Sequence, residues 1–262
     1  MKDQVEPVEG FEFEPDTIVV TSEHQREKLQ ACGLDAEPFN GFVDASFYIT
    51  LGIHAGIKSG ISAEGNVNML QSLVQHRPVR LGEPLTVKGR IRKITNVPRG
   101  ITVDTDVVFF GEDGKPAISA PRLSLKPDPT RLGVKGAGDR PAPVVEDINS
   151  LTAFGSYQLT PDNVKRYSME GNSIHYEMEA ANKAGFRAPI IGGAMGVHYL
   201  LHALWQNCRP ASFDLSIYFR RPIFWDDAIE VRADIAGDSW RAMCLARGGK
   251  VLTEAKIKNL GE

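Results

Sequence analysis

The segment RPVRLGEPLTV (residues 77–87) recurs later in the chain as RPIFWDDAIEV (residues 221–231). The two copies align without a gap at an offset of 144 residues (221 − 77), with an acid at Glu83 and Asp227 and valine at Val87 and Val231. An internal repeat is the sequence mark of a duplicated architecture. The repeat therefore favours two similar halves in this chain of 262 residues.

A second, weaker pair of segments precedes the first. VTSEHQREK (residues 20–28) resembles LTPDNVKRY (residues 159–167). Thr21 and Thr160 are expected to be N-caps of short helices, because a threonine before an acidic first turn satisfies free backbone N–H groups. Chance similarity is the alternative for both pairs, because each match is short.

Each half has the same expected order of elements: a short polar helix, a long apolar helix and a run of strands. The long helices are expected over residues 43–57 and 194–205. Strands are expected over residues 83–94, 100–111, 115–126, 213–223, 227–237, 240–249 and 250–260, where β-branched residues and partial alternation recur. Asp113-Gly114 predicts a hairpin turn. Strands without alternating helices predict an α+β fold, with each helix across one face of a sheet.

Composition limits the classes of protein that fit. Hydrophobic residues make up 42% and charged residues 24%, which suits a globular chain with a substantial core. The net charge of −3 gives no basic field for nucleic acid, and no apolar run approaches the roughly 20 residues of a membrane helix. Residues 1–16 are acidic and unlike a secretory signal. The three cysteines lack CxxC spacing, which disfavours a disulfide framework and a zinc site and suggests a cytoplasmic protein.

The candidate chemistry lies in YSMEGNSIH (residues 167–175) and AGFRAPIIGGAMG (residues 184–196). Glu170 and His175 are separated by a Gly-Asn-Ser loop that can fold both side chains into one pocket. Gly193 directly precedes an apolar run, so its N–H is expected at a helix N-terminus, where free donors and a partial positive charge gather. A carboxylate, an imidazole and such a donor are the parts needed to add water to a 2-enoyl thioester.

These segments resemble the motif of MaoC-like dehydratases and R-specific enoyl-CoA hydratases (hydratase 2), which runs S-G-D-x-N-P-x-H, then A-x-x-x-G-F-x-x-P-I, then H-G-M. The positions that match the motif are Ser168, Glu170, Asn172, His175, Gly185, Phe186, Pro189 and Ile190, and Gly192-Gly193-Ala194 stands at H-G-M. The resemblance is clearest over residues 155–235. It implies a double hot-dog fold: two fused repeats, each an antiparallel sheet wrapped round a central helix. Residues 1–127 would form the first repeat, 128–147 a linker rich in proline and glycine, and 148–262 the repeat that carries the motif.

The resemblance also implies roles for individual residues. Glu170 and His175 would activate a water, and the Gly193 N–H would form the oxyanion hole. Asn172, Ser173 and Gly192 would position the substrate, and Arg187, Arg220 and Arg221 would bind CoA. The expected enzyme is a lyase of fatty acid metabolism that uses no metal or other cofactor, with CoA or acyl carrier protein as part of the substrate.

The first half has no histidine at the matching spacing, so one active site per chain is expected. The first half would shape the acyl pocket, with Val43, Phe47, Ile49 and Leu51 as apolar walls. His198 and His202, four residues apart, could suggest a metal pair, but no third ligand is apparent, and both are expected in the core or the pocket wall. Because hot-dog sheets pair edge to edge, the halves are expected to form an internal pseudo-dimer. Further homodimerisation is left open.

Three departures from the motif keep other functions open. Glutamate replaces the aspartate at Glu170, Met169 replaces a glycine and Ser173 replaces a proline. The extra methylene of glutamate moves a carboxylate by about 1 Å, a misplacement that can cost about a hundredfold in rate. The alternatives are a hot-dog thioesterase and a non-catalytic protein that binds acyl thioesters. The length and polarity of the acyl group are not determined by the sequence.

Overall fold

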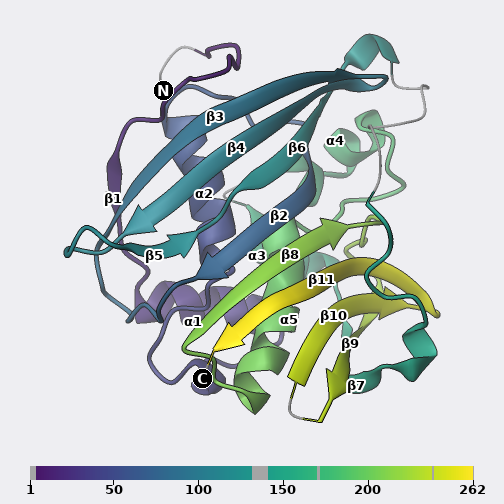
Figure 1. The fold of residues 1–262 in the computed structure, drawn as a ribbon. Coiled ribbons are helices and arrows are strands. Elements are labelled where there is room, and N and C mark those ends of the chain that lie inside the picture. The colour runs from purple at the N-terminus through teal and green to yellow at the C-terminus, as the bar shows by residue number, and fades with distance from the viewer. Residues whose placement is uncertain (1–3, 132–140, 170–171, 238, 262) are drawn as a thin grey trace.

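The computed structural model describes residues 4–131, 141–169, 172–237 and 239–261 (Figure 1). Within them, eleven strands pair into one antiparallel sheet, in the order β1-β3-β4-β5-β2-β8-β11-β10-β9-β7, with β6 paired to β2 and β4. The strands are β1 (Asp16–Ile18), β2 (Val67–Gln75), β3 (Leu85–Val97), β4 (Gly100–Phe110), β5 (Pro116–Ser119), β6 (Arg122–Pro127), β7 (Thr152–Gln158), β8 (Ser212–Phe219), β9 (Ala228–Ala236), β10 (Ser239–Arg247) and β11 (Lys250–Gly261).

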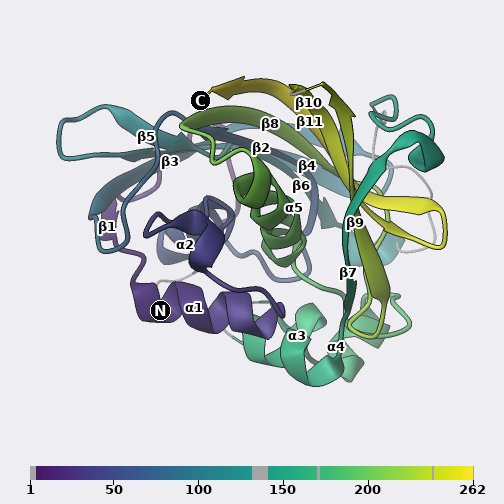
Figure 2. The ribbon, with the colours of Figure 1, turned by 90° about the horizontal axis from the view of Figure 1, so that it is seen from below.

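The helices lie on one side of this sheet. Figure 2 shows α2 and α5 side by side beneath the curled strands, with α1 and α3 beyond them. The α-helices are α1 (Ser22–Ala31), α2 (Phe47–Lys58), α3 (Pro161–Ser168), α4 (Met178–Lys183) and α5 (Gly193–Asn207). Short 3-10 turns are η1 (Glu37–Phe39), η2 (Pro129–Arg131), η3 (Ile148–Ser150) and η4 (Ser173–His175). Each half of the chain therefore wraps its own antiparallel strands round one long helix, which is the predicted α+β arrangement.

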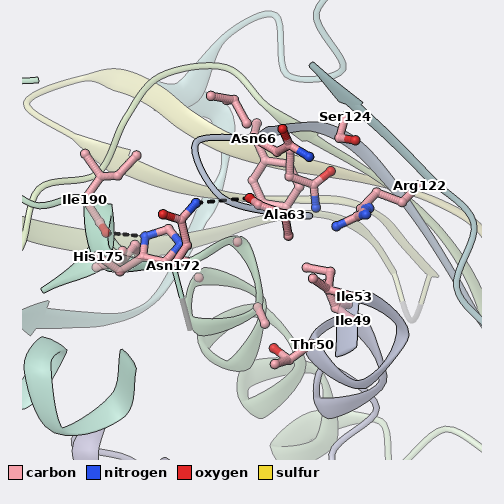
Figure 3. Close-up of a pocket in the computed structure, with 18 of the residues that line it drawn as sticks. Ile49, Thr50, Ile53, Ala63, Asn66, Arg122, Ser124, Asn172, His175 and Ile190 are labelled. Atoms are coloured by element: carbon pink, nitrogen blue, oxygen red, sulfur yellow. Dashed lines mark hydrogen bonds between the residues drawn. The ribbon is translucent and has the colours of Figure 1, made fainter. Parts of the chain in front are cut away.

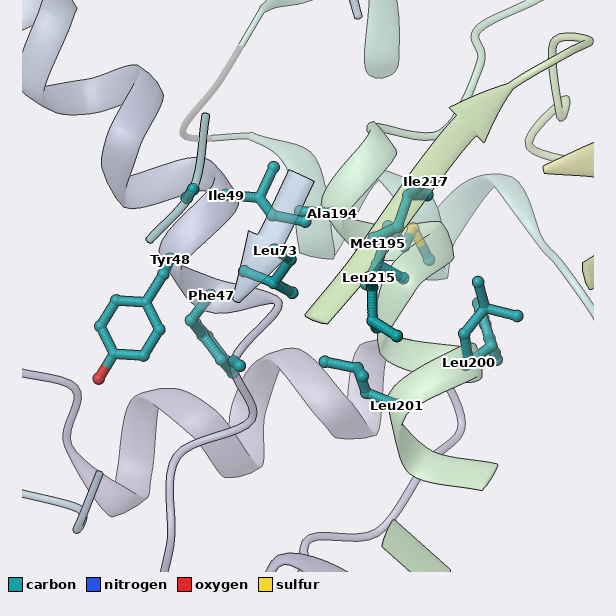
Figure 4. Close-up of a cluster of buried hydrophobic side chains, with 14 of the residues drawn as sticks. Phe47, Tyr48, Ile49, Leu73, Ala194, Met195, Leu200, Leu201, Leu215 and Ile217 are labelled. Carbon is teal, nitrogen blue, oxygen red and sulfur yellow. The ribbon is translucent and has the colours of Figure 1, made fainter. Parts of the chain in front are cut away.

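In the described residues, the strands of the two halves join into one sheet through the pair β2–β8. Leu73 lies opposite Leu215 in this antiparallel register, and both side chains are fully buried. Around them, Ile49 of α2 and Met195 and Leu201 of α5 complete an apolar cluster (Figure 4). The predicted edge-to-edge pairing of the halves is confirmed, and one continuous core stabilises both repeats.

Several local predictions are confirmed. Thr21 accepts a hydrogen bond from the His24 N–H, and Thr160 accepts one from the Asn163 N–H, so both are N-caps. The turn between β4 and β5 closes with Gly114 at φ +72°, a conformation that glycine adopts without strain. The second long helix, predicted over residues 194–205, is α5.

The first long helix begins later than predicted, at Phe47 instead of residue 43. The Val43 N–H is bonded to the Val79 carbonyl, and the Asp44 carboxylate accepts a hydrogen bond from the Ser46 N–H, so these residues form a loop. The strand predicted over residues 115–126 is split into β5 and β6, because Pro121 has no N–H for the ladder.

The sequence patterns missed β1, β2 and β7. Strand β2 carries amide side chains at buried positions, which hides its alternation. The Gln71 Nε2 donates to the Pro121 carbonyl at 3.0 Å, and the Gln75 Nε2 donates to the Pro210 carbonyl at 3.1 Å. These tertiary partners satisfy buried amides that would otherwise be costly.

Of the predicted linker 128–147, residues 132–140 lie outside the described part of the chain. The boundaries at 127 and 148 stay predictions. All three cysteines are free thiols. Across the described ranges, no helix combines the length and the apolar character needed to cross a membrane.

Candidate active site

A cavity of about 990 Å³ opens between the two halves (Figure 3). Helix α2 contributes Ile49, Thr50 and Ile53 to its wall, and the second half contributes His175 and Ile190. Of the predicted apolar walls, Phe47, Ile49 and Leu51 line this cavity. The prediction for Val43 is wrong, because that side chain is buried in the core beside the β-bridge region of residues 42 and 80.

His175 ends the short turn η4 and faces the cavity. Its Nδ1 lies 2.8 Å from the Ile190 carbonyl oxygen. Because a carbonyl can only accept, Nδ1 carries the hydrogen, and Nε2 keeps a lone pair in the neutral ring. Burial lowers the pKa of His175 below its ordinary value of 6.5, with the Ile190 hydrogen bond and Glu64 opposing that shift. The ring is therefore a neutral base at pH 7.

Asn172 and Ser173 hold the loop before His175 in place. The Asn172 Oδ1 caps η4 by accepting from the Ile174 N–H at 3.3 Å, and its Nδ2 donates to the Ala63 carbonyl at 3.3 Å. The Ser173 Oγ donates to the Glu64 carboxylate at 2.8 Å. Asn172 and Ser173 thus attach the loop to residues of the first half.

Glu170 and Gly171 lie outside the described residues, so the predicted partnership of Glu170 with His175 stays a prediction. The chain just before them is well held. The Lys28 Nζ donates to the Tyr167 carbonyl at 2.9 Å, and the Tyr167 hydroxyl lies 2.8 Å from the His198 Nε2. Both halves therefore contact Tyr167.

His198 is the centre of a buried polar network. Its Nδ1 lies 2.6 Å from the Asp44 Oδ2 and 2.5 Å from the Ser46 Oγ, both of the first half. His202 is also buried, and its ring packs against Phe39. In the described ranges, no three His, Cys, Asp or Glu side chains cluster closely enough to hold a metal ion.

The N-terminus of α5 lies beside His175. Gly192 is the N-cap, and a Cβ built on it would lie 3.7 Å from the His175 Nε2. Gly193 is the first helical residue, so its N–H has no carbonyl within the helix to bond. A Cβ on Gly193 would lie 2.8 Å from the Cζ of Phe219, closer than real contacts allow. Glycine at 193 thus lets the Phe219 ring pack directly on the backbone of the helix start.

The three arginines predicted for CoA have different surroundings. Arg187 pairs with Asp226 and Asp227 and stacks on Phe224, and it is not among the residues that line the cavity. Arg220 and Arg221 do line it. Both are engaged, because Arg220 bonds the Glu254 carboxylate and Arg221 donates to the Val251 carbonyl at 2.6 Å. The geometry disfavours Arg187 as a ligand for CoA.

Sequence reasoning missed other cations on the cavity wall. They are Lys28, Arg99, Arg122 and Lys183. Each comes from a different element, and no spacing in the sequence relates one to another. Only the curling of the sheet round α2 and α5 brings them to one cavity.

No family model and no curated protein matches the chain. Solved structures do. HtdX from Mycobacterium tuberculosis superposes with a TM-score of 0.72 at 18% identity, covering 94% of this chain and 99% of that one. A MaoC-like dehydratase from Phytophthora capsici gives 0.67 at 19% identity, covering 94% and 96%.

A putative oleoyl thioesterase from Lactobacillus plantarum has a TM-score of 0.62 at 12% identity, covering 94% of this chain and 95% of that one. Sequence identities this low are evidence for a shared fold alone. Together with the two helix-centred antiparallel halves joined at β2 and β8, they show that the chain has the double hot-dog fold, which it shares with solved MaoC-like dehydratases.

Proposed function

We propose that this protein is an acyl-thioester hydratase that adds water reversibly to a 2-enoyl-CoA and gives a 3-hydroxyacyl-CoA. The observation that supports this most is the His175 ring, neutral and with its Nε2 unprotonated, at the N-terminus of α5 and inside a cavity of about 990 Å³. Asn172 and His175 match the hydratase motif in sequence, and Glu170 and Gly193 stand at its aspartate and H-G-M positions.

In the proposed reaction, the thioester lies with its carbonyl oxygen at the Gly193 N–H. A water held between Glu170 and His175 attacks the β-carbon. The water gives a proton to this pair, its oxygen forms the C–O bond, and the double-bond electrons move toward the thioester oxygen. A proton from the same pair then reaches the α-carbon, so that H and OH are added without net change in the protein.

The Gly193 N–H stabilises the charge that develops on the thioester oxygen. It lies at the start of the fifteen-residue helix α5, where the partial positive charge of the helix adds to the hydrogen bond. A donor placed where charge develops is typically worth about 10²–10³ in rate. Phe219 packs on Gly193 beside this bond.

The direct test follows crotonyl-CoA and longer 2-enoyl-CoAs by loss of enoyl absorbance, with free thiol measured in parallel. We expect enoyl loss without thiol release, and a loss of about 10²–10⁴-fold in kcat for Glu170→Gln, the size of a general acid–base contribution. Glu170→Asp should keep part of the activity. Full activity of Glu170→Gln would contradict the role proposed for that residue.

A thioesterase is the second candidate, because the putative oleoyl thioesterase shares this fold. In that reaction the water attacks the thioester carbonyl and CoA leaves as a thiol. Thiol release at the rate of substrate loss would replace the hydratase proposal by this one. Tight binding of acyl-CoA with neither reaction would favour a non-catalytic binding protein.

A further inference from the structure

Arg122 opens strand β6, on the first-half side of the cavity. Its backbone lies opposite Gln71 of β2 and Thr105 of β4. Figure 3 shows its guanidinium pointing into the cavity, across from His175 and Asn172 and above Ile49 and Ile53. A cation thus occupies the wall where an acyl pocket for plain fatty chains would be apolar.

The guanidinium has no protein partner in the described part of the chain. No carboxylate pairs with it and no carbonyl accepts its five donors, in contrast to Arg220, which bonds Glu254. Over the described residues, the lining of this cavity contains basic side chains but no Asp or Glu. Arg122 is half-buried, and an unpaired charge that is partly removed from water is costly, which suggests a use for it.

Arg122 is half-buried and lines both this cavity and a small neighbouring pocket. Desolvation lowers its pKa to about 10, so the side chain is still charged at pH 7. The unpaired donors are held ready for an anion that enters the cavity.

Other polar groups share this part of the wall. Asn66 is fixed by its Nδ2, which donates to the Ser62 carbonyl at 3.2 Å, and its buried Oδ1 has no hydrogen-bond partner in the described part of the chain. Ser124, two residues from Arg122 on β6, lines the cavity on the same face. The Ser124 hydroxyl can donate to an anion held at Arg122, whereas the Asn66 Oδ1 can only accept and would not contact a carboxylate.

We propose that the acyl chain of the substrate ends in a carboxylate, which Arg122 binds at the first-half side of the cavity, opposite His175. This deepens the hydratase proposal and rests on it. The substrate class would be 2-enedioyl-CoA thioesters. Arginine suits a carboxylate because its planar donors can form two parallel hydrogen bonds with the two oxygens.

A phosphate of CoA is the other anion that could reach a cation in this cavity. The diphosphate and the 3′-phosphate of CoA together carry several negative charges near pH 7, and the single Arg122 guanidinium beside apolar residues of α2 matches one charge better. Arg99, in the turn between β3 and β4, also lines the cavity and suits the CoA end. The acyl carboxylate is therefore the occupant that we assign to Arg122.

The test compares matched substrates that differ only at the far end of the chain: trans-2-hexenoyl-CoA and trans-2-hexenedioyl-CoA, with the pentenoyl and octenoyl pairs for length. We expect the wild type to favour the carboxylate member by about 10–10³-fold in kcat/KM, the range of a charge-assisted bidentate pair. Arg122→Met, similar in length and apolar, should abolish that preference while the neutral substrate keeps its kcat. Arg122→Lys should keep part of it.

Two results would overturn the proposal. Equal kcat/KM for both members in the wild type would show that the chain end is not recognised. An equal loss for both members in Arg122→Met would place the arginine on CoA instead. Arg99→Met is the matched control, expected to weaken both members alike and to leave their ratio unchanged.

A binding experiment separates failure of this inference from failure of the hydratase proposal. Adipyl-CoA and hexanoyl-CoA have no double bond to hydrate, so their Kd values, measured by calorimetry, do not depend on hydratase activity. We expect tighter binding of adipyl-CoA by the wild type, and no difference in Arg122→Met. If that preference is found but no enoyl-CoA is hydrated, the carboxylate site stands and the proposed reaction fails.

Discussion

The two halves of the molecule use the same helix-in-sheet unit in different ways. In the second half, α5 has twelve buried residues among its fifteen, and its N-terminus carries glycines beside His175. In the first half, α2 has six buried residues among twelve, and the rest of its inner face borders the cavity. A tightly packed helix holds a backbone N–H in place, whereas a helix with one face on a cavity leaves room for a ligand. Duplication thus allows one half to be rigid and the other to be open.

The N-termini of α2 and α5 also differ in what they contact. Before α2, Asp44 and Ser46 are fully buried and bonded to His198 of the other half. Before α5, Gly192 and Gly193 face the cavity. The first helix start therefore serves the interface between the halves, and the second is available to a ligand.

The largest effect is expected at His175. His175→Asn removes the Nε2 base from the second half, and we expect kcat for hydration to fall by about 10²–10⁴-fold. Binding of a saturated acyl-CoA should change little, because the first half is untouched. Calorimetry with hexanoyl-CoA checks that the variant is folded and competent. Retention of full kcat would mean that the chemistry does not lie in the second half.

An alanine placed in each long helix sharpens the contrast between the halves. Gly193→Ala should lower kcat by about 10²-fold, because the new Cβ must displace Phe219 and shift the N–H. Gly52→Ala on α2 meets only ordinary contacts with Val107 at 3.5 Å, and should raise stability by about 0.5–1 kcal/mol. Kinetics and thermal melts of both variants give the comparison. Equal effects on kcat would contradict it.

The buried network of Asp44, Ser46 and His198 is expected to contribute more to stability than to the rate of the reaction. Asp44→Ala leaves His198 and Ser46 without their buried acceptor, and we expect a loss of about 3–5 kcal/mol of unfolding free energy in urea denaturation. Asp44→Asn keeps one acceptor oxygen and should cost less. If Asp44→Ala melts like the wild type, the network does not hold the halves together.

A smaller effect is expected in the pH dependence of kcat/KM and of stability, which tests the burial of His175. Because its pKa lies below 6.5 in the folded protein, the acid limb of kcat/KM should appear below pH 6.5. The unfolded chain takes up this proton at about pH 6.5. Its share of stability is therefore complete above pH 6.5 and is lost as pH falls through the folded pKa.

His175→Asn provides the control for that effect. His202 has a pKa lowered by burial as well, so part of the acid sensitivity should remain in the variant. The difference between wild type and variant in urea denaturation isolates the His175 contribution. An acid limb above pH 6.5 would contradict a desolvated ring.

The features predicted correctly from the sequence depend mostly on neighbouring residues. Thr21 and Thr160 were recognisable as N-caps, and the α5 region was recognisable as a long apolar helix, since both depend on neighbours in sequence. Strand β2 was missed because Gln71 and Gln75 occupy buried positions that only distant carbonyls make acceptable. The start of α2 was misplaced because the Asp44 region is held by His198, 154 residues away.

The sequence by itself determined the internal repeat, the α+β class and the chain order of Glu170, His175 and Gly193. Its resemblance to the hydratase motif implied the double hot-dog fold. These features can be read from residue types and their spacing along the chain. Only the tertiary structure decided that His175 is a neutral base, because the Ile190 carbonyl and burial set its tautomer and pKa. It also decided that Arg122 is unpaired and faces the cavity, because β6 brings its side chain to a wall where the described chain offers no Asp or Glu.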